Sequence, residues 1–127
     1  MNLHEMKWSK TEKEAARRAF AKAYRKECGA IAAKIRKMTA TASEPEDLWR
    51  IHDLLTRERR QTDEKYDYRY SVLLFVFARL LQEGWIAEAD LQGLADEKLD
   101  AIRYLAGCGT SGPADQSRAR DFETEAG

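Results

Sequence analysis

The sequence predicts an all-α protein, a helical bundle with one unusually long N-terminal helix. Helix-breaking residues are scarce, because the 127 residues include only two Pro and seven Gly, and four of the Gly lie within residues 107–127. Apolar residues recur at steps of three and four along most of the remaining chain. Charged residues make up 35% of the chain, against a typical share of about 25%. This composition is expected for helices that each bury one apolar stripe.

The first helix is expected to begin near residue 10 and to end at Met38. Ser9 and Thr11 are each followed three residues later by a Glu, so either pair can form a capping box. The apolar positions of this helix form a stripe like that of a coiled coil: Phe20, Tyr24, Cys28, Ile31, Ile35 and Met38. A helix of about 28 residues is roughly 42 Å long, which is more than the width of a domain of this size. We therefore expect this helix to contact a second chain.

A second helix is expected to start within the sequence Ser43-Glu44-Pro45-Glu46, with Ser43 as its cap and Pro45 in its first turn. Its side chains at helical spacing are Leu48, Trp49, Ile51, His52 and Leu55. Two alternatives stay open for its end. Either Thr62 or Asp63 caps a new helix, or the helix continues with a kink.

The most apolar stripe of the chain predicts the core helix. It comprises Tyr66, Tyr70, Leu73, Leu74, Phe77, Leu80 and Leu81. We expect this helix to end at Glu83, where Gly84 can adopt the left-handed conformation that closes a helix.

The remaining sequence predicts a short turn over residues 88–92 and a last helix over residues 96–106, closed by Gly107. The chain is thus divided into a flexible N-terminus of residues 1–8, a helical domain of residues 9–106 and a tail of residues 107–127. The tail is expected to be disordered, because its only large apolar residue is Phe122.

The charges are distributed unevenly, although they sum to zero. Residues 1–40 contain eleven Lys and Arg against four Asp and Glu, so this segment carries +7 and the rest carries −7. A basic helix can bind nucleic acid, an acidic membrane surface or an acidic protein surface. The overall pI near 6.7 disfavours nucleic acid, since dedicated nucleic-acid-binding domains generally have a pI above about 9.

No apolar run approaches the roughly 18 residues of a membrane-spanning helix, and the N-terminus lacks the apolar core of a signal peptide. We therefore expect a cytoplasmic protein without membrane insertion. Cys28 and Cys108 form no Cys-x-x-Cys pair and are expected to be free thiols.

No arrangement of residues is typical of a catalytic or metal site. His4 precedes the first helix, and His52 has neither Ser nor Cys one helical turn away. The neighbouring Asp53 points about 100° away from His52 around a helix, so the two do not form a ready-made dyad. The sequence therefore predicts no enzymatic activity, no metal and no cofactor.

One segment is rich in the residue types that protein interfaces favour. It contains Trp49, His52, Asp53, Arg57, Arg59 and Arg60. The pattern alone equally allows Trp49 to be an ordinary core residue and the Arg residues to be ordinary surface.

Three neighbouring segments resemble the fluorescence recovery proteins of cyanobacteria. They are DLWRIHD (residues 47–53), DEKYDYRYSVLLFVFAR (residues 63–79) and LLQEGWI (residues 80–86), and the resemblance extends more weakly over residues 8–106. It implies an all-helical protein that forms an antiparallel homodimer and carries no cofactor. It also implies a partner, the C-terminal domain of the photoactivated orange carotenoid protein. Such proteins accelerate its return to the orange form and so end photoprotective quenching at the phycobilisome.

The resemblance also implies roles for individual residues. Trp49 is expected in the dimer interface, which the stripe on the first helix extends to Tyr24, Ile31 and Ile35. The expected partner-binding residues are Asp53, Arg59, Phe75 and His52.

Ala101 stands where cyanobacterial members of this family carry a Lys that is linked to binding of the carotenoid protein. Relatives also occur in bacteria without that protein or phycobilisomes. The alternative function is therefore that of a dimeric helical adaptor or chaperone-like protein with a different partner.

Overall fold

The structure is a computed structural model that describes residues 6–109, for residues 108 and 109 the backbone only. Four α-helices and one short 3₁₀ helix account for most of this segment, and it contains no β-strand, which confirms the all-α prediction. Their bounds are α1, Lys10–Thr41; α2, Pro45–Lys65; α3, Leu73–Glu83; η2, Glu88–Leu91; and α4, Asp96–Gly109. The structure does not describe residues 110–127, where most of the expected tail lies.

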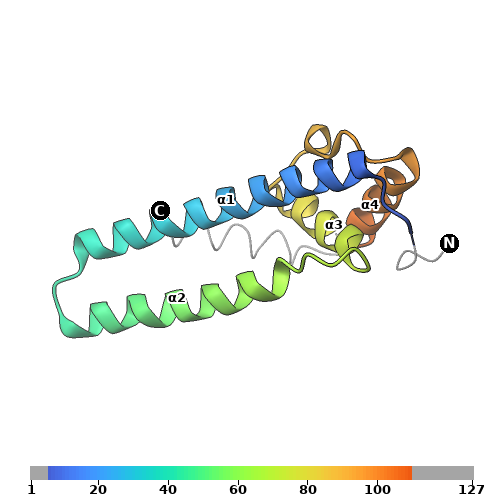
Figure 1. Cartoon of the computed structure of the whole chain (residues 1–127). Coiled ribbons are helices and arrows are strands. Elements are labelled where there is room, and N and C mark those ends of the chain that lie inside the picture. Colours follow the sequence, from blue (N-terminus) through green and yellow to red (C-terminus); the bar gives the residue numbers. More distant parts are fainter. Residues whose placement is uncertain (1–5, 110–127) are drawn as a thin grey trace.

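The helices form two parts that we call the head and the arm (Figure 1). The head comprises residues 6–27 and 66–109, in which the first half of α1 packs with α3, η2 and α4. The arm comprises residues 28–65, in which the second half of α1 lies antiparallel to α2. No helix among the described residues is long and apolar enough to cross a membrane.

The start of α1 follows the expected capping box. Ser9 Oγ accepts a hydrogen bond from the Glu12 N–H (3.1 Å), and Glu12 Oε1 accepts one from the Ser9 N–H (2.9 Å). The helix continues to Thr41, three residues beyond the expected end, while the Thr39 hydroxyl donates to the Ile35 carbonyl oxygen (2.7 Å). With 32 residues, α1 is about 48 Å long.

The start of α2 differs from the prediction by one residue. Its N-cap is Glu44 and not Ser43, and Pro45 is its first residue. The Asp47 carboxylate accepts hydrogen bonds from the N–H groups of both Ser43 and Glu44 (3.1 Å each). The side chain at the third helical position thus reaches back to the N-cap, as in a capping box.

The junction of α2 and α3 also differs from the prediction. No new helix starts at Thr62 or Asp63, because α2 continues to Lys65. Residues 66–72 are not helical, so the expected core helix begins only at Leu73.

Three tyrosines at every second position explain why residues 66–72 are not helical. The ring centroids of Tyr66 and Tyr68 lie 5.3 and 4.8 Å from that of Phe20 on α1, and Tyr70 packs against Trp8 at 5.3 Å. A spacing of two suits an extended chain that places all three rings against α1, whereas a helix would spread them around its circumference.

The core of the head is apolar and closely packed. Its largest fully buried side chains are Phe77, Leu73, Leu74, Leu80, Leu91 and Ile102. On α1 the buried positions in the head are mostly Ala, which lets the following elements approach closely. At Gly93 (φ 113°) an added Cβ would lie 2.8 Å from the Ala15 Cβ, so this approach requires a glycine.

Both ends of the described segment extend the expected helical domain. Met6 and Trp8, which we expected in a flexible N-terminus, pack against the core of the head. At the other end α4 does not stop before Gly107 but continues to Gly109. A glycine inside a helix costs only about 1 kcal/mol relative to Ala, which is too little to end one. The left-handed Gly84 (φ 84°) after α3 is as expected.

A buried ion pair fastens α4 to the start of α1. The Lys98 Nζ lies 3.0 Å from Glu12 Oε2, and the Ala95 N–H donates to the same oxygen (3.0 Å). Burial alone would raise the pKa of Glu12, but the hydrogen bonds from the Ser9 and Ala95 N–H groups and the Lys98 cation outweigh it and lower the pKa to about 2.

Candidate interaction surface

The candidate site is an exposed face of α2 that combines apolar and charged side chains. We call it the α2 face, and it comprises Leu48, Trp49, His52, Leu55 and Arg59. The exposed fractions of Leu48, Trp49 and Leu55 are 56%, 61% and 43%. These values exclude the alternative that Trp49 is a core residue of the single chain.

The spacing along α2 explains why these side chains share one side of the helix. Leu48, His52, Leu55 and Arg59 follow one another at steps of four, three and four, which brings them onto one stripe. The side of α2 that faces α1 is occupied by other residues, of which Ile51 and Leu54 are buried. In the sequence, Leu48 and Leu55 belong to the same helical spacing as the buried Ile51. Only the structure shows that Leu48 and Leu55 are exposed.

The charged residues of the α2 face are available to a partner. Arg59 Nε lies 3.2 Å from Asp63 Oδ2, yet 82% of the Arg59 side chain is exposed. His52 Nδ1 lies 3.5 Å from Asp53 Oδ1, and both side chains are largely exposed. Exposed ion pairs such as that of Arg59 contribute roughly 0–1 kcal/mol, so Arg59 can exchange Asp63 for a group of another protein at small cost.

Tyr24 brings α1 into the same surface. It is 46% exposed, and its ring packs edge-on against Tyr66 at 5.2 Å. The nearby Cys28 thiol is the main cause that raises the pKa of Tyr24; Asp63 also raises it, and Arg59 lowers it. Tyr24 is therefore close to the charged end of the α2 face.

The other predicted site residues lie in different places. Ile35 is half-buried, and Ile31 is already buried within the single chain, which leaves little of it for a second chain. Phe75 is 41% exposed but belongs to α3 in the head, apart from the α2 face. Ala101 is half-buried on α4 and packs against the core of the head.

The sequence analysis missed a buried polar cluster where the arm meets the head. Lys65 Nζ lies 2.6 Å from both Glu27 Oε2 and Glu83 Oε1. The Tyr66 hydroxyl donates to Glu27 Oε1 (2.8 Å), and Trp85 Nε1 donates to Glu83 Oε1 (3.1 Å). The cluster thereby joins α1, the end of α2 and the end of α3. No sequence signal points to it, because the two carboxylates are 38 and 18 positions from Lys65.

The pKa shifts in this cluster follow from burial and charge. Burial raises the pKa of Glu83, but the hydrogen bonds and charges of Lys65 and Arg79 outweigh it, so the net pKa is lowered. Burial and the hydrogen bond to Glu27 raise the pKa of Tyr66. The Glu83 carboxylate is therefore ionised at neutral pH.

Neither the α2 face nor the cluster is arranged for metal binding. Within residues 6–107, no three His, Cys, Asp or Glu side chains are grouped so that they could hold a metal ion. What the α2 face offers is apolar area beside exposed charges, which is the chemistry of a protein interface.

Comparison with known proteins identifies the family. A family model described as photoprotection regulator fluorescence recovery protein matches residues 8–106. The fluorescence recovery protein of Synechocystis sp. is 39% identical over 102 residues, which cover 80% of this chain and 94% of that protein.

Two solved structures agree with this match. The fluorescence recovery protein of Fremyella diplosiphon is similar with a TM-score of 0.74 and 45% identity, and that of Synechocystis sp. with 0.74 and 39%. Each match covers 79% of this chain and 98% of the other. The chain described here belongs to the fluorescence recovery protein family of photoprotection regulators.

Proposed function

We propose that this protein is a non-enzymatic regulator that binds the C-terminal domain of the photoactivated orange carotenoid protein and accelerates its return to the orange form. This would end photoprotective quenching. The observation that carries the proposal is the exposure of Arg59 and His52 on the α2 face, with Asp53 exposed beside His52, in a chain whose family acts in photoprotection.

The proposed mechanism is selective binding. A protein that binds the closing form of its partner better than the open form lowers the free energy of closing. Arg59 on the arm and Phe75 on the head lie on separate parts of the molecule. A partner that contacts both would be held at two points, which restricts the orientation of its mobile domain.

We also propose that the protein acts as an antiparallel homodimer through the α2 face. The exposed apolar side chains of Leu48, Trp49 and Leu55 would be removed from water by the same face of a second chain. Arg59 lies one helical turn beyond Leu55, toward the head, and would stay accessible at the edge of that interface. Tyr24 and the half-buried Ile35 would extend the contact to α1.

The test is the dark recovery of the photoactivated orange carotenoid protein, followed by its visible absorbance with and without this protein. Arg59→Leu is expected to reduce the acceleration about tenfold, because loss of a charged contact worth roughly 1.4 kcal/mol has this effect. The matched control is Arg57→Leu, which removes an exposed Arg of α2 outside the α2 face. Equal recovery rates with the Arg59 variant and the unaltered protein would refute the role of Arg59.

A second candidate function is that of a dimeric helical adaptor with a different client. Ala101 favours it, because this position offers a small side chain packed against the core and no charge for a partner. If the unaltered protein does not accelerate recovery of any orange carotenoid protein, the adaptor function is the better account. If Ala101→Lys then confers acceleration, the changed partner is explained by this residue.

A further inference from the structure

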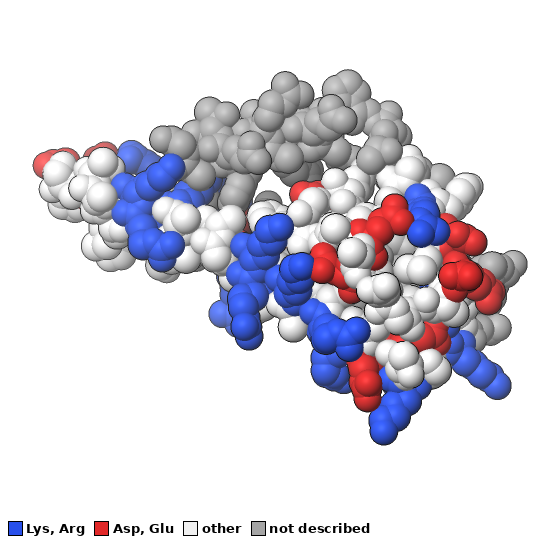
Figure 2. Space-filling view, turned by 90° about the horizontal axis from the view of Figure 1, so that it is seen from above, with Lys and Arg blue, Asp and Glu red and all other residues white. Residues whose placement is uncertain are grey.

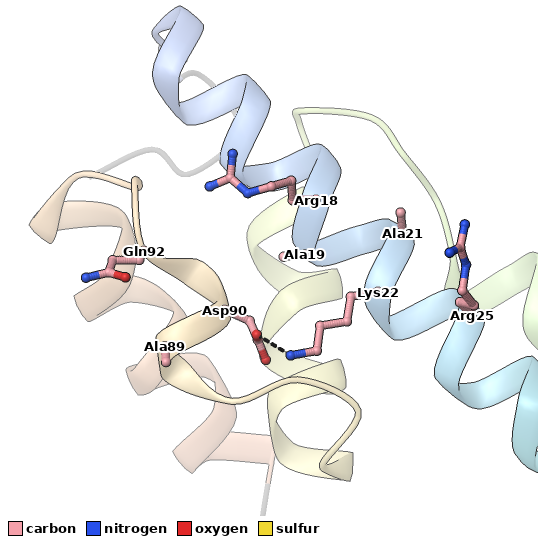
Figure 3. Close-up of a pocket in the computed structure, with 8 residues that line it drawn as sticks. All are labelled: Arg18, Ala19, Ala21, Lys22, Arg25, Ala89, Asp90 and Gln92. Carbon is pink, nitrogen blue, oxygen red and sulfur yellow. Dashed lines mark hydrogen bonds and ion pairs between the residues drawn. The ribbon is translucent and has the colours of Figure 1, made fainter.

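A second surface lies on α1, away from the α2 face. A groove of about 620 Å³ separates α1 from η2 (Figure 3). The small side chains of Ala19, Ala21 and Ala89 line it, and charged side chains of both elements surround it. Because the exposed side chains of Ala21 and Ala89 are small, an extended peptide can lie close to both elements along this groove.

Three cations of α1 border the groove at helical spacing. Arg18, Lys22 and Arg25 follow at steps of four and three, so they share one side of α1. In Figure 3, Lys22 reaches toward Asp90 of η2, whereas Arg25 extends away from η2 at the rim. Lys22 Nζ lies 2.5 Å from Asp90 Oδ1. Among the described residues, neither Arg18 nor Arg25 forms an ion pair, so the groove keeps an excess of positive charge.

Asp90 is held in place and ionised. It accepts a hydrogen bond from the Ala87 N–H (2.8 Å), and this bond is the main cause that lowers its pKa, followed by the hydrogen bond from Lys22. Asp90 therefore pairs with one cation of the groove at neutral pH and leaves two arginines for a ligand. A guanidinium group binds a carboxylate through two parallel hydrogen bonds, which makes arginine suited to acidic side chains.

The positive surface continues beyond the groove. A second, more open hollow on α1 is lined by the cations Lys10, Lys13, Arg17 and Arg18 and by one carboxylate, that of Glu14. Arg17 lies over the ring of Tyr68 at 5.2 Å and Lys13 over that of Tyr70 at 5.4 Å, so both side chains have defined positions. Figure 2 shows Lys and Arg side chains following one another toward the head, over which Asp and Glu side chains gather. A long field of one sign attracts a ligand of the opposite sign.

We propose that the groove between α1 and η2 is a docking site for an acidic segment of a protein partner, whose carboxylates pair with Arg18 and Arg25. Around α1, the three cations of this site lie about 100–160° from Tyr24, which borders the α2 face. The groove would form a second contact, and this proposal holds whichever partner the α2 face binds. Nucleic acid fits less well, because Asp90 lies inside the groove and the whole chain has a net charge of zero.

The probe for this site is a fluorescein-labelled oligoglutamate peptide, and its anisotropy is measured with the full-length protein. The double variant Arg18→Gln/Arg25→Gln is expected to raise the Kd about fivefold to tenfold, the effect of losing two exposed charged contacts. The matched control, Arg36→Gln/Lys37→Gln, removes the same charge from exposed positions near the far end of α1. It is expected to change the Kd less than about twofold.

Asp90→Asn provides a test with the opposite sign. Asn keeps an oxygen that can accept the hydrogen bond from the Ala87 N–H, but it releases Lys22 for the ligand. We expect the Kd of the peptide to fall about threefold, with circular dichroism unchanged. If Asp90 had only a structural role, the Asp90→Asn variant would bind the peptide more weakly or with unchanged Kd.

Three results would overturn the proposal. They are an equal loss of affinity in the groove variant and the control, weaker peptide binding by Asp90→Asn, and tighter binding of a single-stranded RNA of equal charge than of oligoglutamate. The Arg59→Leu variant should bind the peptide with unchanged affinity. This separates a failure of the groove from a failure of the proposed regulatory function.

Discussion

The head and the arm use their side chains differently. In the head, large apolar side chains such as Phe77, Leu80 and Ile102 are fully buried. In the arm, the buried apolar side chains are Ile31, Ile51 and Leu54, while Trp49 is 61% exposed. Two helices side by side have no third layer to cover their remaining faces. The head is thus stabilised by its own core, whereas the arm keeps apolar surface that a second protein can cover.

The largest effect is expected from two phenylalanines of α3 that differ in burial. Phe77 is fully buried, and Phe77→Ala should lower the free energy of unfolding by about 3–5 kcal/mol, since it removes a large side chain and leaves a cavity. Phe75 is 41% exposed, and Phe75→Ala should cost less than about 1 kcal/mol. Urea unfolding measures both, and similar losses would contradict the assignment of the core to the head.

A somewhat smaller effect is expected at the contact between the two parts. Lys65→Met leaves the carboxylates of Glu27 and Glu83 without their shared cation and should lower the free energy of unfolding by about 3 kcal/mol. Lys26→Met is the control, because Lys26 is exposed on α1. If both variants unfold at the same urea concentration as the unaltered protein, the cluster does not stabilise the joint.

The smallest effect on folding, with a clear effect on assembly, is expected in the arm. Because Trp49 is exposed in the single chain, Trp49→Glu should change the free energy of unfolding of that chain by less than about 1 kcal/mol. In the proposed dimer the new carboxylate would be buried in an apolar interface, which costs several kcal/mol and should give monomers. Light scattering measures the molar mass. A soluble dimer of normal stability would remove Trp49 from the interface.

The clearest difference between prediction and structure lies in residues 66–72, where the spacing of the tyrosines fits both a helix and an extended chain. Tyr66, Tyr70 and Leu73 follow at steps of four and three and so predicted a helix, yet residues 66–72 are not helical. Three tyrosines at alternate positions are equally compatible with an extended chain. The aromatic surface presented by Phe20 and Trp8 decides in its favour, and this surface exists only once α1 has packed.

The sequence by itself determined the all-α class, the long first helix, the cap at Ser9 and the left-handed Gly84, because these depend on interactions between residues within a few positions of one another. The motif that begins at residue 47 also indicated the family. Only the tertiary structure decided which side of α2 is buried, how Lys65 joins three helices and where the groove of Arg18 and Arg25 lies. The burial of a side chain and the ion pairs between distant positions depend on how the helices pack. A periodic pattern in the sequence shows only that a helix has an apolar side.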